Sequence, residues 1–209
     1  MNKFNKNQRD ILREVGNICA GNAAVALAQI LFKKIELQVP TLKSVPLVKL
    51  ASTIDKDGIP IIGIQMETLG MINSQILLLF SQESAYQLME LLVGSPKMQK
   101  TKLITQIGIS SLKEIGNIVI SAYVSTLSAM SKLPVYLSCP QFTDGVPEMV
   151  IKSVFGTSKK QNPNVILIET YFNEFTNSVK GKFFIAFDPN SMRLILKACK
   201  AFAKSMKKS

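Results

Sequence analysis

Two short sets of polar residues recur in this 209-residue chain with the same spacing. In each set a carboxylate is followed three residues later by a side-chain amide, and another polar residue stands four positions before the carboxylate. The sets are Asp10, Glu14 and Asn17, and Ser110, Glu114 and Asn117. On a helix, residues at these spacings share one face. A carboxylate can pair with a cation. An amide offers both a donor and an acceptor, and can hold a water molecule without changing its protonation state.

The composition limits the chemistry available to such residues. Histidine is absent, which removes the usual general base at neutral pH and the Ser-His and Cys-His nucleophile pairs. Cys19, Cys139 and Cys199 are far apart and form no C-x-x-C pair. We therefore expect buried thiols rather than a zinc site or a disulfide framework. Any catalysis must use carboxylates, amides, hydroxyls or groups that a partner brings.

The chain carries a formal net charge of +11. Such a charge favours acidic partners, although a solvated basic surface is the simplest interpretation. Charge alone supports the alternative of a nucleic-acid-binding protein, because the sequence contains no RNP or zinc-finger pattern and no aromatic residues interleaved with its lysines. We expect no nucleic acid among the partners.

Apolar residues make up 47% of the chain and the mean hydropathy is +0.22. The longest apolar runs are nevertheless strand-length, far below the roughly 20 residues of a membrane span. The first six residues are mostly polar and contain no apolar run of the kind found in a secretory signal. We therefore expect a cytoplasmic protein that does not insert into a membrane.

The sequence contains an internal repeat. Leu12–Ile18 returns as Leu112–Ile118, an offset of 100 residues, and Ile76–Phe80 matches Phe183–Phe187 with an offset of 107. The second half has thus gained about seven residues, most simply in the polar loop Gly156–Pro163. Two halves of this size would each be marginal alone. We therefore expect one domain over residues 1–209, made of repeats at about 8–94 and 103–204 that share one core.

Each half is expected to contain a long helix, strands and a shorter helix. Hydrophobic periodicity predicts helices at 8–32, 82–93, 105–131 and 189–204. Frequent β-branched residues between turn signals predict strands at 46–54, 59–67, 72–81, 148–155, 164–174 and 179–187. Ser81 and Asp188 resemble N-caps of the two shorter helices. Residues 94–102 would connect the halves.

A helical wheel places each polar set opposite the apolar face of its long helix. Gly16 and Gly116 recur inside the sets. Each glycine destabilises its helix by about 1 kcal/mol relative to alanine, so we expect that close packing or access for a partner requires it. Gly21 and Ser121 keep the next turn small, which would allow another surface to approach. The sets could simply be outward polar residues of amphipathic helices. Their recurrence in register in a diverged copy favours a function.

With the prolines that follow, Pro40 and Pro140, the two sets read D/S-x3-E-x2-N-x22-P. This double pattern resembles the signature of the CheC/FliY/CheX phosphatases over essentially the whole chain. The resemblance implies a mixed α+β fold, duplicated about a pseudo-twofold axis, with two long helices packed on a shared, mostly antiparallel six-stranded sheet.

The resemblance also implies an activity: stimulated hydrolysis of the aspartyl phosphate on a chemotaxis response regulator such as CheY. Asn17 and Asn117 would orient the attacking water, Glu14 and Glu114 would dock onto the regulator's lysine, and Asp10 and Ser110 would give supporting contacts. The chain would bind no cofactor itself, and magnesium is expected on the regulator. CheD is a further partner of such proteins. The main alternative is a non-catalytic adaptor or flagellar switch component on the same fold.

Overall fold

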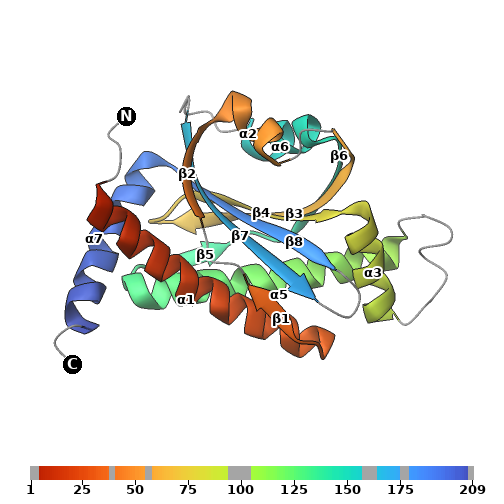
Figure 1. Cartoon of the computed structure of the whole chain (residues 1–209), viewed down its shortest axis with the longest axis horizontal. Coiled ribbons are helices and arrows are strands. Elements are labelled where there is room, and N and C mark those ends of the chain that lie inside the picture. The colour runs from red at the N-terminus through yellow and green to blue at the C-terminus, as the bar shows by residue number, and fades with distance from the viewer. Residues whose placement is uncertain are drawn as a thin grey trace.

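The structure is a computed structural model that describes residues 5–37, 41–54, 58–93, 105–156, 164–174 and 179–206. Both halves follow one order of elements (Figure 1). The first half contains α1 (Lys6–Leu31), β1 (Ile35–Leu37), β2 (Thr41–Pro46), α2 (Leu47–Ile54), β3 (Ile61–Gly70), β4 (Ser74–Ser81) and α3 (Gln82–Val93). The second contains α5 (Gln106–Ser131), β5 (Val135–Leu137), β6 (Gln141–Gly145), α6 (Pro147–Phe155), β7 (Asn164–Glu174), β8 (Lys180–Phe187) and α7 (Pro189–Met206).

The strands of both halves form one sheet. The strand order is β1-β7-β8-β4-β3-β5, with β2 also pairing β7 and β6 also pairing β3. The pairings are antiparallel. β4 and β8 join the halves at the centre, and each half gives its two short strands to the other half: β1 and β2 pair with β7, while β5 and β6 pair with β3. Neither half therefore builds its own part of the sheet alone.

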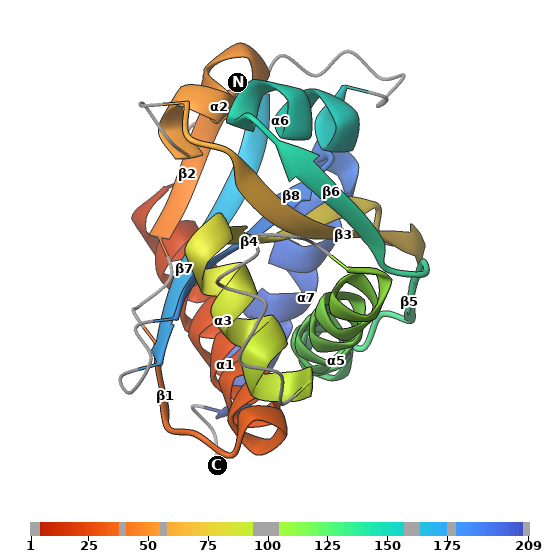
Figure 2. The same cartoon turned by 90° about the vertical axis from the view of Figure 1, so that its right-hand side faces the viewer.

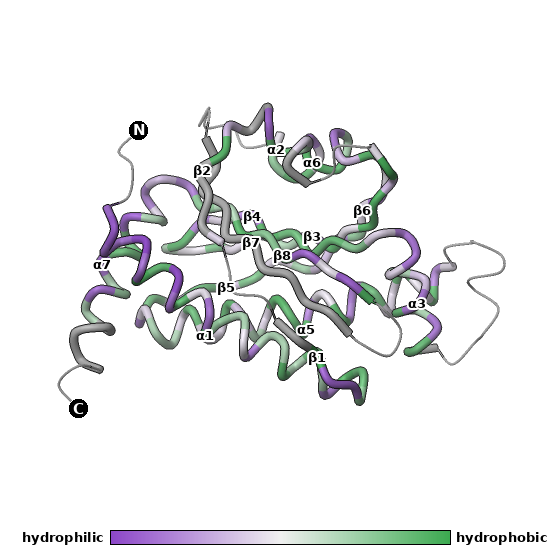
Figure 3. Tube along the Cα trace, in the orientation of Figure 1, coloured by the Kyte–Doolittle hydropathy of each residue, from purple (hydrophilic) through white to green (hydrophobic). Residues whose placement is uncertain are grey.

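Helices cover both faces of the sheet. α1, α5, α3 and α7 lie on one face, and the short helices α2 and α6 lie on the other (Figures 1 and 2). β4 is buried on both sides: Ile76, Leu78 and Phe80 pack under the long helices, whereas Leu77 and Leu79 pack under α2 and α6. Because both faces of such a strand are buried, its sequence is a continuous apolar run, and the central strands are coloured mainly green in Figure 3.

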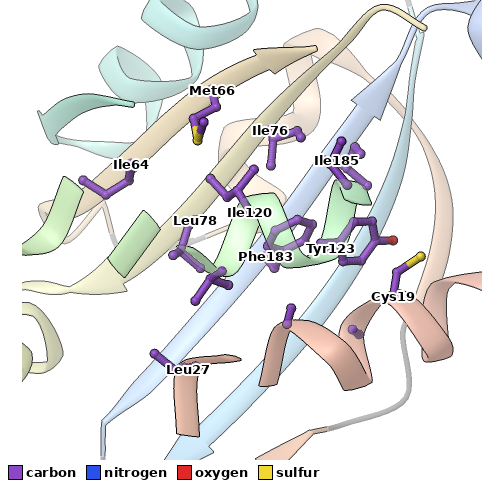
Figure 4. Close-up of a cluster of buried hydrophobic side chains, with 14 of the residues drawn as sticks. Cys19, Leu27, Ile64, Met66, Ile76, Leu78, Ile120, Tyr123, Phe183 and Ile185 are labelled. Carbon is purple, nitrogen blue, oxygen red and sulfur yellow. The ribbon is translucent and has the colours of Figure 1, made fainter. Parts of the chain in front are cut away.

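Under the long helices the core is tightly packed. The Tyr123 ring stacks on Phe183 with their centroids 4.6 Å apart, and Cys19 lies beside them (Figure 4). Burial raises the pKa of the Cys19 thiol to about 12 and that of Cys199 to about 11. These two cysteines are the buried thiols that the sequence predicts. For Cys139 that prediction is wrong, because its side chain is exposed in the connection between β5 and β6.

The fold class is confirmed, and so are the long helices, the shorter helices α3 and α7, and strands β3, β4, β7 and β8. Both predicted caps are present: the Ser84 amide donates to Ser81 Oγ at 3.1 Å, and the Ser191 amide donates to Asp188 Oδ1 at 2.9 Å. The predicted connector at 94–102, and residues 157–163 of the loop at 156–163, lie outside the described residues.

Two predicted strands are wrong. Residues 46–54 and 148–155 were expected to be extended, but they are largely the helices α2 and α6. In α6 the buried residues Val150, Ile151, Val154 and Phe155 follow helical spacing behind a proline in the first turn. The four short strands β1, β2, β5 and β6 were missed, so the described sheet has eight strands instead of the expected six.

By length and composition, α1 is the one helix among the described residues that could cross a membrane. Its apolar side is already used in the protein core, because Leu12, Cys19 and Leu27 are each at most 2% exposed. This pattern is that of a core helix.

The close approach of α5 to the sheet requires glycine at position 116. A Cβ there would lie 2.3 Å from Ile64 Cγ2 and 2.8 Å from Ile64 Cβ, whereas a Cβ at Gly21 would meet nothing within 4 Å. We predict that Gly116→Ala lowers the free energy of unfolding by about 1–3 kcal/mol through overpacking. Gly21→Ala, the matched control, should raise it by up to about 1 kcal/mol. Urea unfolding measures both, and an unaffected Gly116→Ala would contradict the packing argument.

The cysteine environments predict selective thiol reactivity. Because the thiolate is the reactive form and burial raises the pKa of Cys19 and Cys199, only Cys139 should react quickly with a thiol reagent at pH 8 in the folded protein. Unfolding in urea should release all three thiols. A chromogenic disulfide reagent counts them, and rapid reaction of more than one thiol in the native state would show that the core is open.

Candidate functional site

The two long helices lie side by side on one face of the sheet and run in opposite directions (Figure 1). The Asn22 amide of α1 donates to Thr126 Oγ1 of α5 at 3.1 Å, which marks where they meet. Each helix has a defined start. Asn5 and Gln8 form a capping box at α1, and Thr105 accepts a hydrogen bond from the Gly108 amide at α5.

The polar sets form matching ridges on the outer side of these helices. Asp10 and Glu14 on α1 are exposed, and the next ridge residue, Asn17, is half-buried. Ser110, Glu114 and Asn117 repeat this order of exposure on α5. We call these the α1 ridge (Asp10, Glu14, Asn17) and the α5 ridge (Ser110, Glu114, Asn117).

The ridge side chains have no internal partners. Within the described part of the chain, none of the six forms a hydrogen bond or an ion pair. Unpaired carboxylates and amides at a surface remain available to an external molecule. Asn22 of α1 differs from them, because its side chain is used in the contact between the helices.

The glycine inside each ridge is a buried residue. Gly16 and Gly116 are both buried, and the Gly116 backbone packs against Ile64 of β3. Because α5 contacts the sheet at Gly116, the position of the next residue, Asn117, relative to the sheet is fixed. Asn117 lies about 100° further around the helix, on the side turned away from the sheet. At Gly21, one turn beyond Asn17, the space is open. Close packing thus explains the glycine at position 116, whereas the space beside Gly21 is open to another surface.

The ridges are too far apart to form a single site. Asn17 precedes the contact residue Asn22 by five positions, and Asn117 precedes Thr126 by nine. Since the helices run in opposite directions and rise 1.5 Å per residue, the two asparagines are separated by about 20 Å along the axes. The two ridges therefore cannot contribute to one compact site.

The prolines of the motif lie away from the ridges. Pro140 is half-buried in the connection between β5 and β6, and Pro40 lies outside the described residues. Among the described residues no group of three or more Cys, Asp or Glu side chains could hold a metal ion.

A ridge can position groups but has no base suited to neutral pH. An amide can orient a water molecule, and a carboxylate can pair with a cation of a docked partner. The arrangement fits a reaction in which the partner supplies the electrophile and its charge stabilisation.

Comparisons of the sequence with known proteins find relatives of this chain. Residues 8–44, which contain the first motif, match the model of the CheC-like family. The chain is 29% identical over 170 residues to the CheY-P phosphatase CheC of Bacillus subtilis, covering 81% of each protein. It is 23% identical to the flagellar motor switch phosphatase FliY of the same organism, covering 71% of this chain but 42% of FliY.

Solved structures share the fold. Thermotoga maritima FliY superposes with a TM-score of 0.73 at 17% identity, covering 95% of this chain and 98% of that chain. The middle domain of Helicobacter pylori FliM gives 0.66 at 13% identity, covering 93% and 99%. Borrelia burgdorferi CheX, from a CheX–CheY complex, gives 0.55 at 20% identity, covering 82% and 97%. The fold is thus the one shared by FliY, CheX and the FliM middle domain. The resemblance to the CheC, FliY and CheX proteins is confirmed.

Because the asparagine side chains have no described partners, we predict that they contribute little to stability. Asn17→Ala and Asn117→Ala should each change the free energy of unfolding by less than about 0.5 kcal/mol, as for other surface substitutions. Urea titration followed by circular dichroism checks this. A loss of 2 kcal/mol or more at either position would assign that amide a structural role.

Proposed function

We propose that this protein is a phosphatase that speeds hydrolysis of the aspartyl phosphate on a CheY-type chemotaxis response regulator in the cytoplasm. The observation that carries the proposal is the pairing of an exposed Glu with a half-buried Asn, repeated on both long helices and without described side-chain partners. Two comparisons support it. CheC, the relative at 29% identity, is named as a CheY-P phosphatase, and CheX, a structural neighbour, was solved in complex with CheY.

In the proposed mechanism the asparagine inserts into the regulator's phosphorylation site. Its carbonyl oxygen accepts a hydrogen bond from a water molecule and aligns the water oxygen with phosphorus. As the new P–O bond forms, the bond to the aspartyl oxygen breaks. The aspartate leaves as a carboxylate and the water's proton passes to the departing phosphate. The amide stays neutral throughout, which suits a chain without histidine.

The regulator is expected to bring the magnesium ion that neutralises charge on the phosphoryl oxygens. Glu14 and Glu114 would pair with its active-site lysine. They stand about one helical turn before Asn17 and Asn117 and would therefore set the register of docking. Asp10 and Ser110, a further turn away, would make supporting contacts.

A CheD-type protein is a proposed second partner. The amphipathic helix α3, which carries Leu88, Leu91 and Leu92, is a candidate surface for it. In the structure Leu88 is fully buried and Leu92 packs against the core, whereas Leu91 is 37% exposed. Of these three leucines, Leu91 is thus the one that could contact a partner.

Replacing both asparagines provides the test. We predict that Asn17→Ala combined with Asn117→Ala reduces the decay of phosphorylated regulator to the regulator's own rate, because no group then aligns the water. Each single variant should keep part of the stimulation, since the ridges are separate. Loss of labelled phosphate from the regulator, with magnesium present, gives the rates.

Binding provides the control for this test. The double variant keeps Glu14 and Glu114, so it should still bind the regulator loaded with beryllium fluoride as a phosphoryl mimic. Gln29→Ala with Ser125→Ala is a matched pair of changes at exposed positions of α1 and α5 outside the ridges and should leave the decay rate near that of the wild type. Full stimulation by the double asparagine variant would refute the mechanism.

A non-catalytic adaptor or flagellar switch component remains the second candidate. The observation that favours it is the fold shared with the FliM middle domain, at a TM-score of 0.66. The same decay assay separates the two, because an adaptor binds the regulator and leaves its phosphate lifetime unchanged.

A further inference from the structure

The two ridges are alike, but the helices beside them are not. α7 packs against α1 near the start of the α1 ridge, whereas α3 packs against α5 near the start of the α5 ridge (Figures 1 and 2). The α3–α5 contact is close: a Cβ at Gly108 would lie 2.3 Å from Met89 Sδ. α7 also contacts α5, but toward its C-terminal end, away from the α5 ridge. Each ridge therefore has its own neighbouring helix.

The surroundings of the α1 ridge are basic. Lys6, Arg9 and Arg13 are exposed on the same turns of α1 as Asp10 and Glu14. α7 adds Arg193 and Lys197, both exposed, and the half-buried Lys200, and it contains no acidic residue. Cations outnumber carboxylates on this side of the molecule. We call this set of cations the basic rim: Lys6, Arg9, Arg13, Arg193, Lys197 and Lys200.

The surroundings of the α5 ridge lack this charge. Gln106 and Ile109 stand where α1 has Lys6 and Arg9, and Lys113 is the one cation on the ridge turns. α3 has two acidic residues, Glu83 and Glu90, and no Lys or Arg. The equivalent of Glu90 in α7 is Lys197, so the sign of the charge is reversed at that position.

Apolar surface replaces charge at the α5 ridge. Ile107, which corresponds to Asn7 of α1, is 64% exposed. The neighbouring helices each carry an exposed leucine, Leu91 of α3 and Leu194 of α7, both at 37%, so Ile107 is the residue that distinguishes the α5 ridge. An exposed isoleucine contributes short-range contact area but no long-range attraction.

We infer that the two ridges capture the phosphorylated regulator by different means. The α1 ridge attracts its anionic phosphoryl site from a distance through the basic rim, and the α5 ridge engages only on contact, through apolar surface and its own Glu and Asn. This inference rests on the proposed function. A phosphoryl group carries up to about two negative charges, so a basic rim accelerates encounter and a neutral to acidic surrounding does not. Salt screens such steering, since the Debye length falls from about 30 Å at 0.01 M to about 8 Å at 0.15 M.

The test compares the full-length chain with one ridge active at a time. Asn117→Ala leaves the α1 ridge active, and Asn17→Ala leaves the α5 ridge active. Stimulated decay of phosphorylated CheY is measured at limiting protein, with magnesium fixed, between 20 and 300 mM potassium chloride. We expect kcat/KM of the α1 ridge to fall about tenfold over this range and that of the α5 ridge to change less than about twofold. Equal salt dependence of the two variants would overturn the inference.

Exchanging charges between the halves tests the cause. In the Asn117→Ala chain, Arg9→Ile and Lys197→Glu introduce the residues of the other half and should remove most of the salt dependence. In the Asn17→Ala chain, Ile109→Arg introduces the residue of the other half and Glu83→Lys reverses the charge of an exposed residue of α3; together they should create a salt dependence. If the chain with Arg9→Ile and Lys197→Glu still showed a tenfold salt effect, the basic rim would not be its cause. The exchanged side chains lie outside both ridges, so rates at high salt should stay within about twofold of each parent.

The outcomes separate this inference from the proposed function. If the wild type never shortens the phosphate lifetime at any salt concentration, the proposed function fails. If it does so while both single-ridge variants respond equally to salt, only the division between the ridges fails. If the α1 ridge were the slower one at 20 mM salt and its rate rose as salt was added, the sign of the proposed steering would be wrong. If the α5 ridge proved inert, the inference would still be tested on the α1 ridge alone. Its rate should then fall with salt, and the charge exchange should remove that dependence.

Discussion

The contact between the Gly116 backbone and Ile64 fixes the geometry on which the α5 ridge depends. Nothing larger than a hydrogen atom fits between that turn of the helix and β3, so both the height of α5 above the sheet and its rotation are set there. Once Gly116 faces the sheet, Glu114 and Asn117 must lie on the outer flanks. Gly16, at the equivalent position of α1, is also buried. The cost of glycine in a helix is thus offset by close packing that orients the neighbouring polar residues.

The sequence was sufficient to predict the elements with strong periodicity. The long helices, the two-sided buried strand β4 and the exposure of the ridge carboxylates follow from local patterns, and the repeat located their counterparts. It was not sufficient for short segments whose form depends on a distant partner. β1 and β5 have three residues each and exist because β7 and β3 pair with them. α2 and α6 are rich in β-branched residues, which favour strands locally, and were predicted wrongly because burial against the sheet and a proline start decided for helix.

The exchange of short strands explains why a duplicated chain keeps both copies. Since β1 and β2 complete the sheet beside β7, and β5 and β6 complete it beside β3, losing one half would expose sheet edges in the other. The same arrangement sets the long helices in opposite directions and separates the two asparagines by about 20 Å. The repeat therefore places two ridges on one shared sheet, each with its own neighbouring helix. The neighbouring helices differ in charge. α3 and α7 occupy equivalent places in the two halves, but α3 is acidic and α7 is basic.

A neutral amide is the group that tolerates such a difference. A carboxylate or histidine serving as a base would have its pKa shifted by nearby charge, downward beside the cations of α7 and upward beside the glutamates of α3, so two copies in unlike fields would work best at different pH. Asparagine does not titrate, and its action on a bound water depends on position and orientation, which the packing of the helix on the sheet supplies. In the proposed reaction the charged components belong to the regulator. The surroundings of each ridge can then diverge to suit the approach of a partner, while the helix turn that holds the amide stays the same in both halves.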